Sequence, residues 1–162
     1  CTHWLSNNLL WEKVRTIGGA YGVFCNTESM IGSVLFSSYR DPSPFDTCAV
    51  FDECLKEASE IDFDDEEVAR CVMGCYSHFI QPQSPKGRGS VALTRVLYGI
   101  LDEDREKKIL GILSTTAADL KHGFYRLYEN MKRASSSKKA IICGKKALEA
   151  CENAGKIVSL PL

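Results

Sequence analysis

The spacing of apolar residues near the N-terminus predicts a helix followed by a β-hairpin. An apolar residue recurs every three to four positions over residues 5–16, which predicts a helix with Ser6 or Thr2 as its N-cap. Two runs rich in β-favouring residues, 20–28 and 31–40, predict paired strands with a short turn between them. Because neither face of the second run is cleanly polar, we expect the sheet to be covered on at least one side.

Helix start signals dominate the middle of the chain. Ser43–Pro44 and Ser84–Pro85 each place a capping serine before a proline, which is typical of a first helical turn. The four acids from Asp64 to Glu67 favour another start, because they face the positive end of a helix dipole. Further helices are expected from Asp102 and from Ser114 or Thr115.

The end of the chain is expected to form a short strand over residues 140–143 and a helix over 147–153, closed by Gly155. Strands and helices are therefore segregated along the sequence, which predicts an α+β fold. We expect an antiparallel sheet with helices packed on one face. There is no internal repeat, and a chain of 162 residues fits a single domain over residues 1–162.

The composition of the chain argues against nucleic-acid binding and membrane binding as its function. The chain is 44% hydrophobic and 25% charged, with a formal net charge of −1, so neither a nucleic-acid partner nor a membrane partner is expected. No apolar run approaches the roughly 18 residues that a membrane helix needs. The chain begins at Cys1 with no initiator Met and no visible signal peptide, so we expect it to be part of a longer protein.

The charges are unevenly distributed. Residues 41–67 hold eleven acids and one base, whereas residues 121–146 hold eight bases and one acid. Such asymmetry can mark a partner-binding surface, but neither stretch is an unbroken run of like charge, which favours solvated helix faces.

Eight cysteines sit mostly within apolar patterns, where a thiol packs as a small hydrophobic group. A reducing compartment therefore fits the chain better than a disulfide framework does. Cys71, Cys75 and His78 share one helix face and could bind a metal, although the same face continues as an apolar stripe and no fourth ligand is evident. Cys25 has no nearby His or acid that would make it a nucleophile.

The stretch with the clearest chemical potential surrounds a pair of glycines, Gly18 and Gly19. Arg15 precedes the pair and Tyr21 follows it, so two polar side chains flank a piece of bare backbone at a strand edge. The local pattern alone favours a simpler interpretation, a helix C-terminus that ends in glycine beside a partly buried Arg.

These residues also carry a family resemblance. Val14-Arg15, then Gly18-Gly19-Ala20-Tyr21-Gly22, and later Ser38-Tyr39-Arg40-Asp41-Pro42, resemble the last domain of zinc metallopeptidases of the pitrilysin/insulinase family. The similarity is greatest to the branch of presequence protease and falcilysin. It continues through Pro85-Lys86-Gly87 and Thr115-Thr116-Ala117-Ala118-Asp119 and covers most of the chain. Such a domain usually has further strands before its first helix, so the resemblance implies an incomplete sheet here.

The resemblance implies that the zinc cofactor is bound elsewhere. The family binds zinc through His-x-x-Glu-His with a further Glu downstream. No such pattern begins at any of the three histidines of this chain, which are His3, His78 and His122. The zinc site is therefore expected in the N-terminal half of the longer protein, and this chain alone is expected to be inactive. The implied reaction is hydrolysis of unstructured peptides inside a closed chamber.

For this domain the resemblance implies a substrate-binding role. Arg15 and Tyr21 would reach across to a peptide held at the zinc, Tyr21 as a hydrogen-bond donor to the developing oxyanion and Arg15 by fixing a neighbouring carbonyl. The expected partners are the N-terminal half of the same protein and peptide substrates. Some relatives keep the fold without catalysis, so a structural or assembly subunit is the alternative.

Two further features are interpreted as architecture. Arg40 and Asp41 are expected to form a structural ion pair where the second strand ends at Pro42. Lys86–Gly89 lacks the spacing of a nucleotide-binding loop and matches a loop of the family. The sequence leaves the compartment unknown, although the resemblance implies an organelle such as a mitochondrion, a plastid or a digestive vacuole.

Overall fold

The computed structural model describes residues 1–28, 31–133 and 138–149. It confirms the α+β class, with one antiparallel hairpin among helices. Within these residues no helix is both long enough and apolar enough to cross a membrane. The chain divides into two compact units, and the boundaries fall near residue 60 and inside α6 (Ala117–Lys132).

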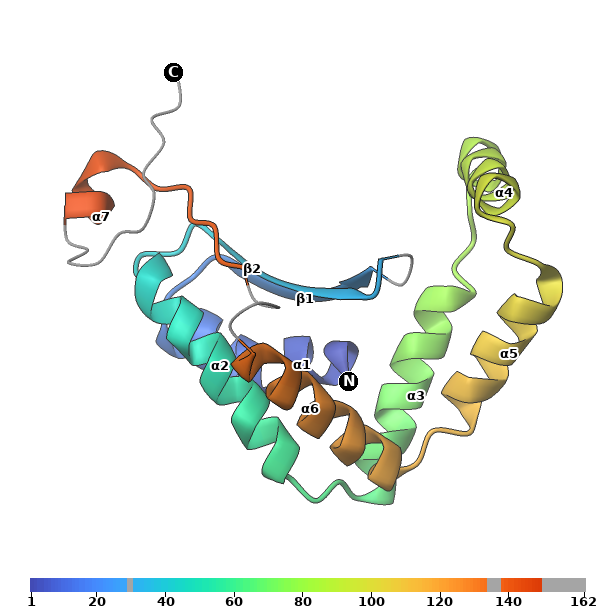
Figure 1. Ribbon diagram of the computed structural model, residues 1–162, viewed down its shortest axis with the longest axis horizontal. Helices are drawn as coiled ribbons and strands as arrows, with labels where there is room; N and C mark the ends of the chain where they lie inside the picture. Colours follow the sequence, from blue (N-terminus) through green and yellow to red (C-terminus); the bar gives the residue numbers. More distant parts are fainter. Residues whose placement is uncertain (29–30, 134–137, 150–162) are drawn as a thin grey trace. The chain divides into compact units, whose positions relative to one another are not determined.

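The hairpin unit comprises residues 2–60 and the chain from residue 124 onward. Its strands pair antiparallel, with Gly22 opposite Tyr39. Helices α1 and α2 lie on the same side of this sheet (Figure 1). On β1, Val23 and Cys25 are buried, whereas Phe24 between them is 52% exposed, so one face of the strand is covered. The elements are α1 (Thr2–Asn7), the π-helix η1 (Trp11–Ile17), β1 (Gly22–Glu28), β2 (Ser33–Tyr39), α2 (Pro44–Glu60), α7 (Lys145–Glu149) and the second half of α6.

Aromatic contacts hold the core of the hairpin unit together. The rings of Trp4 and Phe124 meet edge to face with 5.7 Å between centroids, and Phe124 is fully buried. The Oγ of Ser6 accepts a hydrogen bond from the backbone N–H of Cys25 at 3.0 Å. Ser6 therefore ties α1 to β1 and is not the helix cap that the sequence suggested, because the strand offers its side chain a partner.

The helical unit comprises Cys1 and residues 61–123. Its helices are α3 (Asp65–Phe79), α4 (Pro85–Tyr98), α5 (Asp102–Leu113) and the first half of α6. Two of the predicted start signals are confirmed: the Asp64 carboxylate accepts from the Glu67 N–H at 2.7 Å, and Ser84 Oγ accepts from the Gly87 N–H at 3.1 Å. These local bonds satisfy donors that a helix N-terminus otherwise leaves unpaired.

Three predicted elements differ from the structure. The helix expected over residues 5–16 is divided, because α1 ends at Asn7 and η1 follows. The strand expected over residues 140–143 is wrong, because this segment has no regular secondary structure. The sheet of the described residues consists of β1 and β2, and Ile142 is 89% exposed. The helix expected from Ser114 or Thr115 begins at Ala117, where Thr116 Oγ1 accepts a hydrogen bond from the Asp119 N–H at 3.3 Å. The segment 86–89, which matches a loop of the family, lies within α4, as the start signal at Ser84–Pro85 predicts. The expected end of the last helix near Gly155 lies outside the described residues.

Ion pairs link the acidic stretch of the sequence to the basic one. Lys121 Nζ lies 2.5 Å from Asp62 Oδ1 in the helical unit, and Lys139 Nζ lies 3.2 Å from Asp52 Oδ2 in the hairpin unit. The hydrogen bond from Lys121 lowers the pKa of Asp62 below its usual value. The uneven charge is thus partly balanced within the chain, although exposed pairs of this kind contribute little stability.

Candidate substrate-binding site

The candidate site begins where η1 ends. The Gly18 N–H donates to Lys13 O at 3.0 Å, and the Gly19 N–H donates to Arg15 O at 3.1 Å. The first of these bonds spans five residues, which is the π-helical spacing often found at functional sites. Lys13 also forms an ion pair with Glu57 of α2, which raises the pKa of Lys13 and holds η1 against that helix.

The two glycines are required for different reasons. A Cβ on Gly18 would lie 2.6 Å from the carbonyl oxygen of Val14, which is closer than van der Waals contact allows. Gly19 has a φ of +77°, in the left-handed region that side chains rarely adopt. The sequence therefore turns sharply from η1 to β1 only because both positions lack a side chain.

We predict that Gly18→Ala destabilises the protein by about 1–3 kcal/mol, because its Cβ would press against the backbone of η1. Gly111→Ala is the matched control: Gly111 lies inside α5 with open space around its Cβ position, so alanine there should stabilise the helix slightly. Urea unfolding of both variants measures the difference. Equal stability of Gly18→Ala and the unmodified protein would contradict the close contact.

Arg15 is positioned by an aromatic ring. Its guanidinium lies over the indole of Trp11, 3.8 Å from the ring centroid, and both residues belong to η1. Such a contact orients the planar guanidinium without using its N–H groups. Because no hydrogen bond or ion pair occupies these groups within the described residues, the side chain can donate to a carbonyl brought to this edge.

Tyr21 is exposed, and its backbone is held by the end of the hairpin. Its N–H donates to Tyr39 O at 3.1 Å, and its ring meets that of Tyr39 edge to face with 6.1 Å between centroids. The guanidinium of Arg40 lies 5.7 Å from the Tyr21 ring centroid. The Tyr21 side chain is 66% exposed, and its hydroxyl has no hydrogen-bond partner in the described part of the chain. The backbone and ring of Tyr21 are thus held in place, and its hydroxyl is available to donate a hydrogen bond to a ligand.

The two sequence signatures meet at this site. Besides the contacts of Tyr39 and Arg40 with Tyr21, Pro42 Cγ lies 3.5 Å from the position of a Cβ on Gly19. The sequence interpretation of Ser38–Pro42 as architecture did not anticipate that Arg40 belongs beside Tyr21. The antiparallel register could have indicated it, since pairing of residues 22 and 39 brings Arg40 opposite Tyr21.

The expected ion pair between Arg40 and Asp41 is absent from the described residues. Arg40 faces the two tyrosines instead, and it adopts a φ of +48°, which is unusual for a residue with a side chain. Asp41 Oδ1 accepts a hydrogen bond from the Ser43 N–H at 2.9 Å, just before α2. Asp41 therefore fixes the start of α2, and the charge of Arg40 stays at the candidate site.

Cysteine chemistry does not contribute here. The seven cysteines in the described residues are free thiols, and Cys25 and Cys54 are buried. Burial raises the pKa of Cys25 to about 12 and that of Cys54 to about 11, so both remain protonated at neutral pH. No group of three or more His, Cys, Asp or Glu side chains in the described part of the chain could hold a metal, which argues against the hypothesis of a site at Cys71, Cys75 and His78.

Comparison with known proteins identifies the family of this chain. The family model of the PreP C-terminal domain matches residues 1–146. Over 117 residues the chain is 36% identical to "Presequence protease 1, chloroplastic/mitochondrial" of Arabidopsis thaliana, covering 72% of this chain and 11% of that protein. It is 31% identical over 116 residues to "Presequence protease, mitochondrial" of Emericella nidulans (72% and 11%), and 31% identical over 117 residues to "Protein HypA" of Clostridium perfringens (72% and 12%).

An α+β domain in which Arg15 and Tyr21 flank the Gly18–Gly19 turn is what the sequence resemblance led us to expect. The chain belongs to the family of presequence-protease C-terminal domains. It spans about a tenth of the length of the relatives that it matches.

Proposed function

We propose that this chain is the C-terminal domain of a zinc metalloendopeptidase that degrades unstructured peptides in a closed chamber. The observation that carries the proposal is the pair of available donors beside the Gly18–Gly19 turn. Arg15 rests on Trp11 and Tyr21 on Tyr39, and neither donor group is used by another described residue. The names of the relatives support peptide hydrolysis and a mitochondrial or chloroplast location.

The chemistry of peptide hydrolysis gives both side chains a task. Attack on the peptide bond develops negative charge on the former carbonyl oxygen, and a donor already in position stabilises that charge. In our proposal the Tyr21 hydroxyl is this donor. Arg15 donates to a neighbouring main-chain carbonyl and fixes the register of the peptide. The backbone of Gly18 and Gly19 has no side chain to obstruct the approach of an extended peptide.

The zinc ion does not fit the residues of this chain, because the described residues contain no metal-ligand group and no His-x-x-Glu-His occurs in the sequence. In our proposal it is held by the part of the protein outside this chain. The chain contributes the donors and part of the chamber wall, and the remainder of the protein is its partner.

Peptide hydrolysis before and after removal of zinc tests this proposal. We expect the purified full-length protein, of which this chain is one domain, to cleave an unstructured fluorogenic peptide and to leave a folded protein intact. Activity should be lost in a chelator and return when zinc is added. Full activity in zinc-free protein would contradict the proposed class. A protein that neither binds zinc nor cleaves the peptide would support the alternative, a structural subunit with the same fold.

A further inference from the structure

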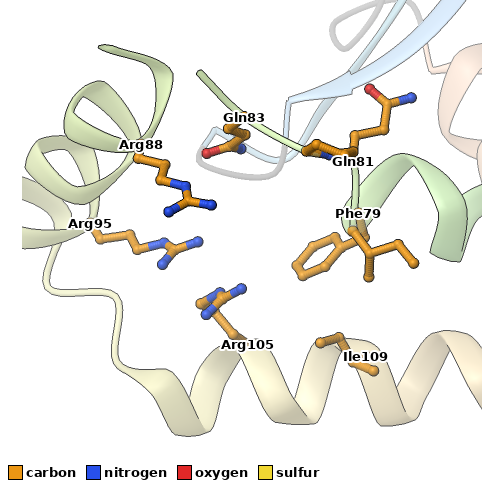
Figure 2. Close-up of a pocket in the computed structure, with 9 residues that line it drawn as sticks. Phe79, Gln81, Gln83, Arg88, Arg95, Arg105 and Ile109 are labelled. Atoms are coloured by element: carbon orange, nitrogen blue, oxygen red, sulfur yellow. The ribbon is translucent and has the colours of Figure 1, made fainter. Parts of the chain in front are cut away.

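A second concave site lies entirely within the helical unit. A pocket of about 280 Å³ is bounded by the end of α3, the linker that follows it, α4 and α5. Figure 2 shows Arg88 and Arg95 of α4 and Arg105 of α5 extending toward the same space. Arg88 and Arg95 are seven residues apart, about two helical turns, so they share one face of α4. The pocket thus gathers three guanidinium groups from two helices.

These three positive charges are poorly compensated. No acid lines the pocket, and in the described part of the chain the guanidinium groups of Arg88 and Arg95 form no ion pair and no hydrogen bond. Arg105 forms an ion pair with the exposed Asp102, but the 3.6 Å from Nη1 to Oδ1 is too long for a hydrogen bond. The Nε of Arg105 is buried without a partner among the described residues. A buried donor without an acceptor is unfavourable. The Nη groups of the three arginines are the donors that an anion in the pocket would accept from.

The remaining walls combine apolar side chains with the two amides Gln81 and Gln83. Phe79 at the end of α3 and Ile109 of α5 lie across the pocket from Arg88 and Arg95 (Figure 2), and Ile80 also lines it. A fully hydrated ion would gain nothing from these side chains. A ligand that carries a charged group on an apolar body would contact both walls at once, as small-molecule pockets with a few placed polar groups do.

We propose that this pocket binds an organic oxyanion, with its charged group on Arg88, Arg95 and Arg105 and its apolar body against Phe79 and Ile109. The planar guanidinium matches carboxylate and phosphate groups by paired hydrogen bonds, so either group meets the requirement. The binding site is separate from Arg15 and Tyr21, which belong to the hairpin unit, and it does not depend on peptide hydrolysis.

Isothermal titration of the purified protein tests the proposal with four probes: phenyl phosphate, benzoate, inorganic phosphate and benzyl alcohol. We expect phenyl phosphate or benzoate to bind at one saturable site. The tighter of the two identifies a phosphate or a carboxylate as the natural group. Inorganic phosphate should bind more weakly than phenyl phosphate, and benzyl alcohol at least tenfold more weakly than the better anion. Raised salt should weaken the anions.

Matched variants locate the binding. Arg95→Gln should weaken the better anion tenfold or more, and Arg88→Gln, at an exposed position, provides a second test if Arg95→Gln unfolds. Arg70→Gln is the control, because Arg70 pairs with Glu66 on α3 and does not line the pocket. It should change the dissociation constant less than twofold. The proposal is overturned if neither organic anion saturates at millimolar concentration, or if the Arg88 and Arg95 variants bind as Arg70→Gln does.

Discussion

Tyr21→Phe is expected to lower kcat of peptide hydrolysis by about 10²–10³-fold, which corresponds to roughly 2.7–4 kcal/mol of lost transition-state stabilisation. The substitution removes only the hydroxyl that we assign to the developing oxyanion. Because that hydroxyl is exposed and has no partner among the described residues, the free energy of unfolding should change by less than about 0.5 kcal/mol. Steady-state kinetics and urea unfolding measure the two quantities on the same sample.

A second tyrosine provides the control for this substitution. Tyr125 on α6 is 54% exposed and lies outside the candidate site, so Tyr125→Phe should leave kcat unchanged. If Tyr21→Phe also kept its full kcat, the oxyanion role would be wrong and Tyr21 would be a surface residue of the hairpin. A large loss of stability in Tyr21→Phe would instead show that its hydroxyl supports the fold.

Arg15→Gln is expected to reduce kcat/KM by up to about 10²-fold, the penalty of a substrate held out of register. The same change removes the stacking of the guanidinium on Trp11, which contributes only about 0.5–1 kcal/mol because the Trp11 ring is exposed to solvent. Folding should therefore survive, and KM should rise together with the fall in kcat. Initial-rate measurements over a range of peptide concentrations separate the two parameters.

Two variants sharpen the interpretation of Arg15. Arg15→Lys keeps the charge but loses the planar group that stacks and donates in pairs, so it should remain strongly impaired. Full activity of Arg15→Lys would mean that charge alone matters and would exclude the fixed hydrogen-bonding role. Arg126→Gln on α6 removes an exposed positive charge elsewhere and should not alter either kinetic parameter.

Local signals in the sequence predicted the helix starts well. Asp64 and Ser84 cap α3 and α4 as expected, because capping depends on residues within one turn of each other. The predicted strand over residues 140–143 is wrong because a strand needs a partner far away in the chain, and local composition cannot supply one. The π-helical form of η1 was also missed, since the spacing of its apolar residues resembles that of an α-helix.

The candidate site shows the same division between local and distant contacts. The glycine pair between Arg15 and Tyr21 stood out as a contiguous motif. The contact of Arg40 with Tyr21 depends on the register of the hairpin. Because the SYRDP motif was interpreted without that register, we predicted an ion pair between Arg40 and Asp41 instead. The arginine pocket was invisible in the sequence, because Arg88, Arg95 and Arg105 are scattered over two helices and an intervening turn.

The most direct test of a substrate-binding role for this domain is peptide hydrolysis by separately produced parts of the protein. The chain, the remainder of the protein with zinc, and their mixture are assayed on one unstructured peptide. We predict activity in the mixture alone, and loss of that activity when the added chain carries Tyr21→Phe although the parts still associate. Activity in the remainder alone, unchanged when the chain is added, would contradict an active site completed by Arg15 and Tyr21.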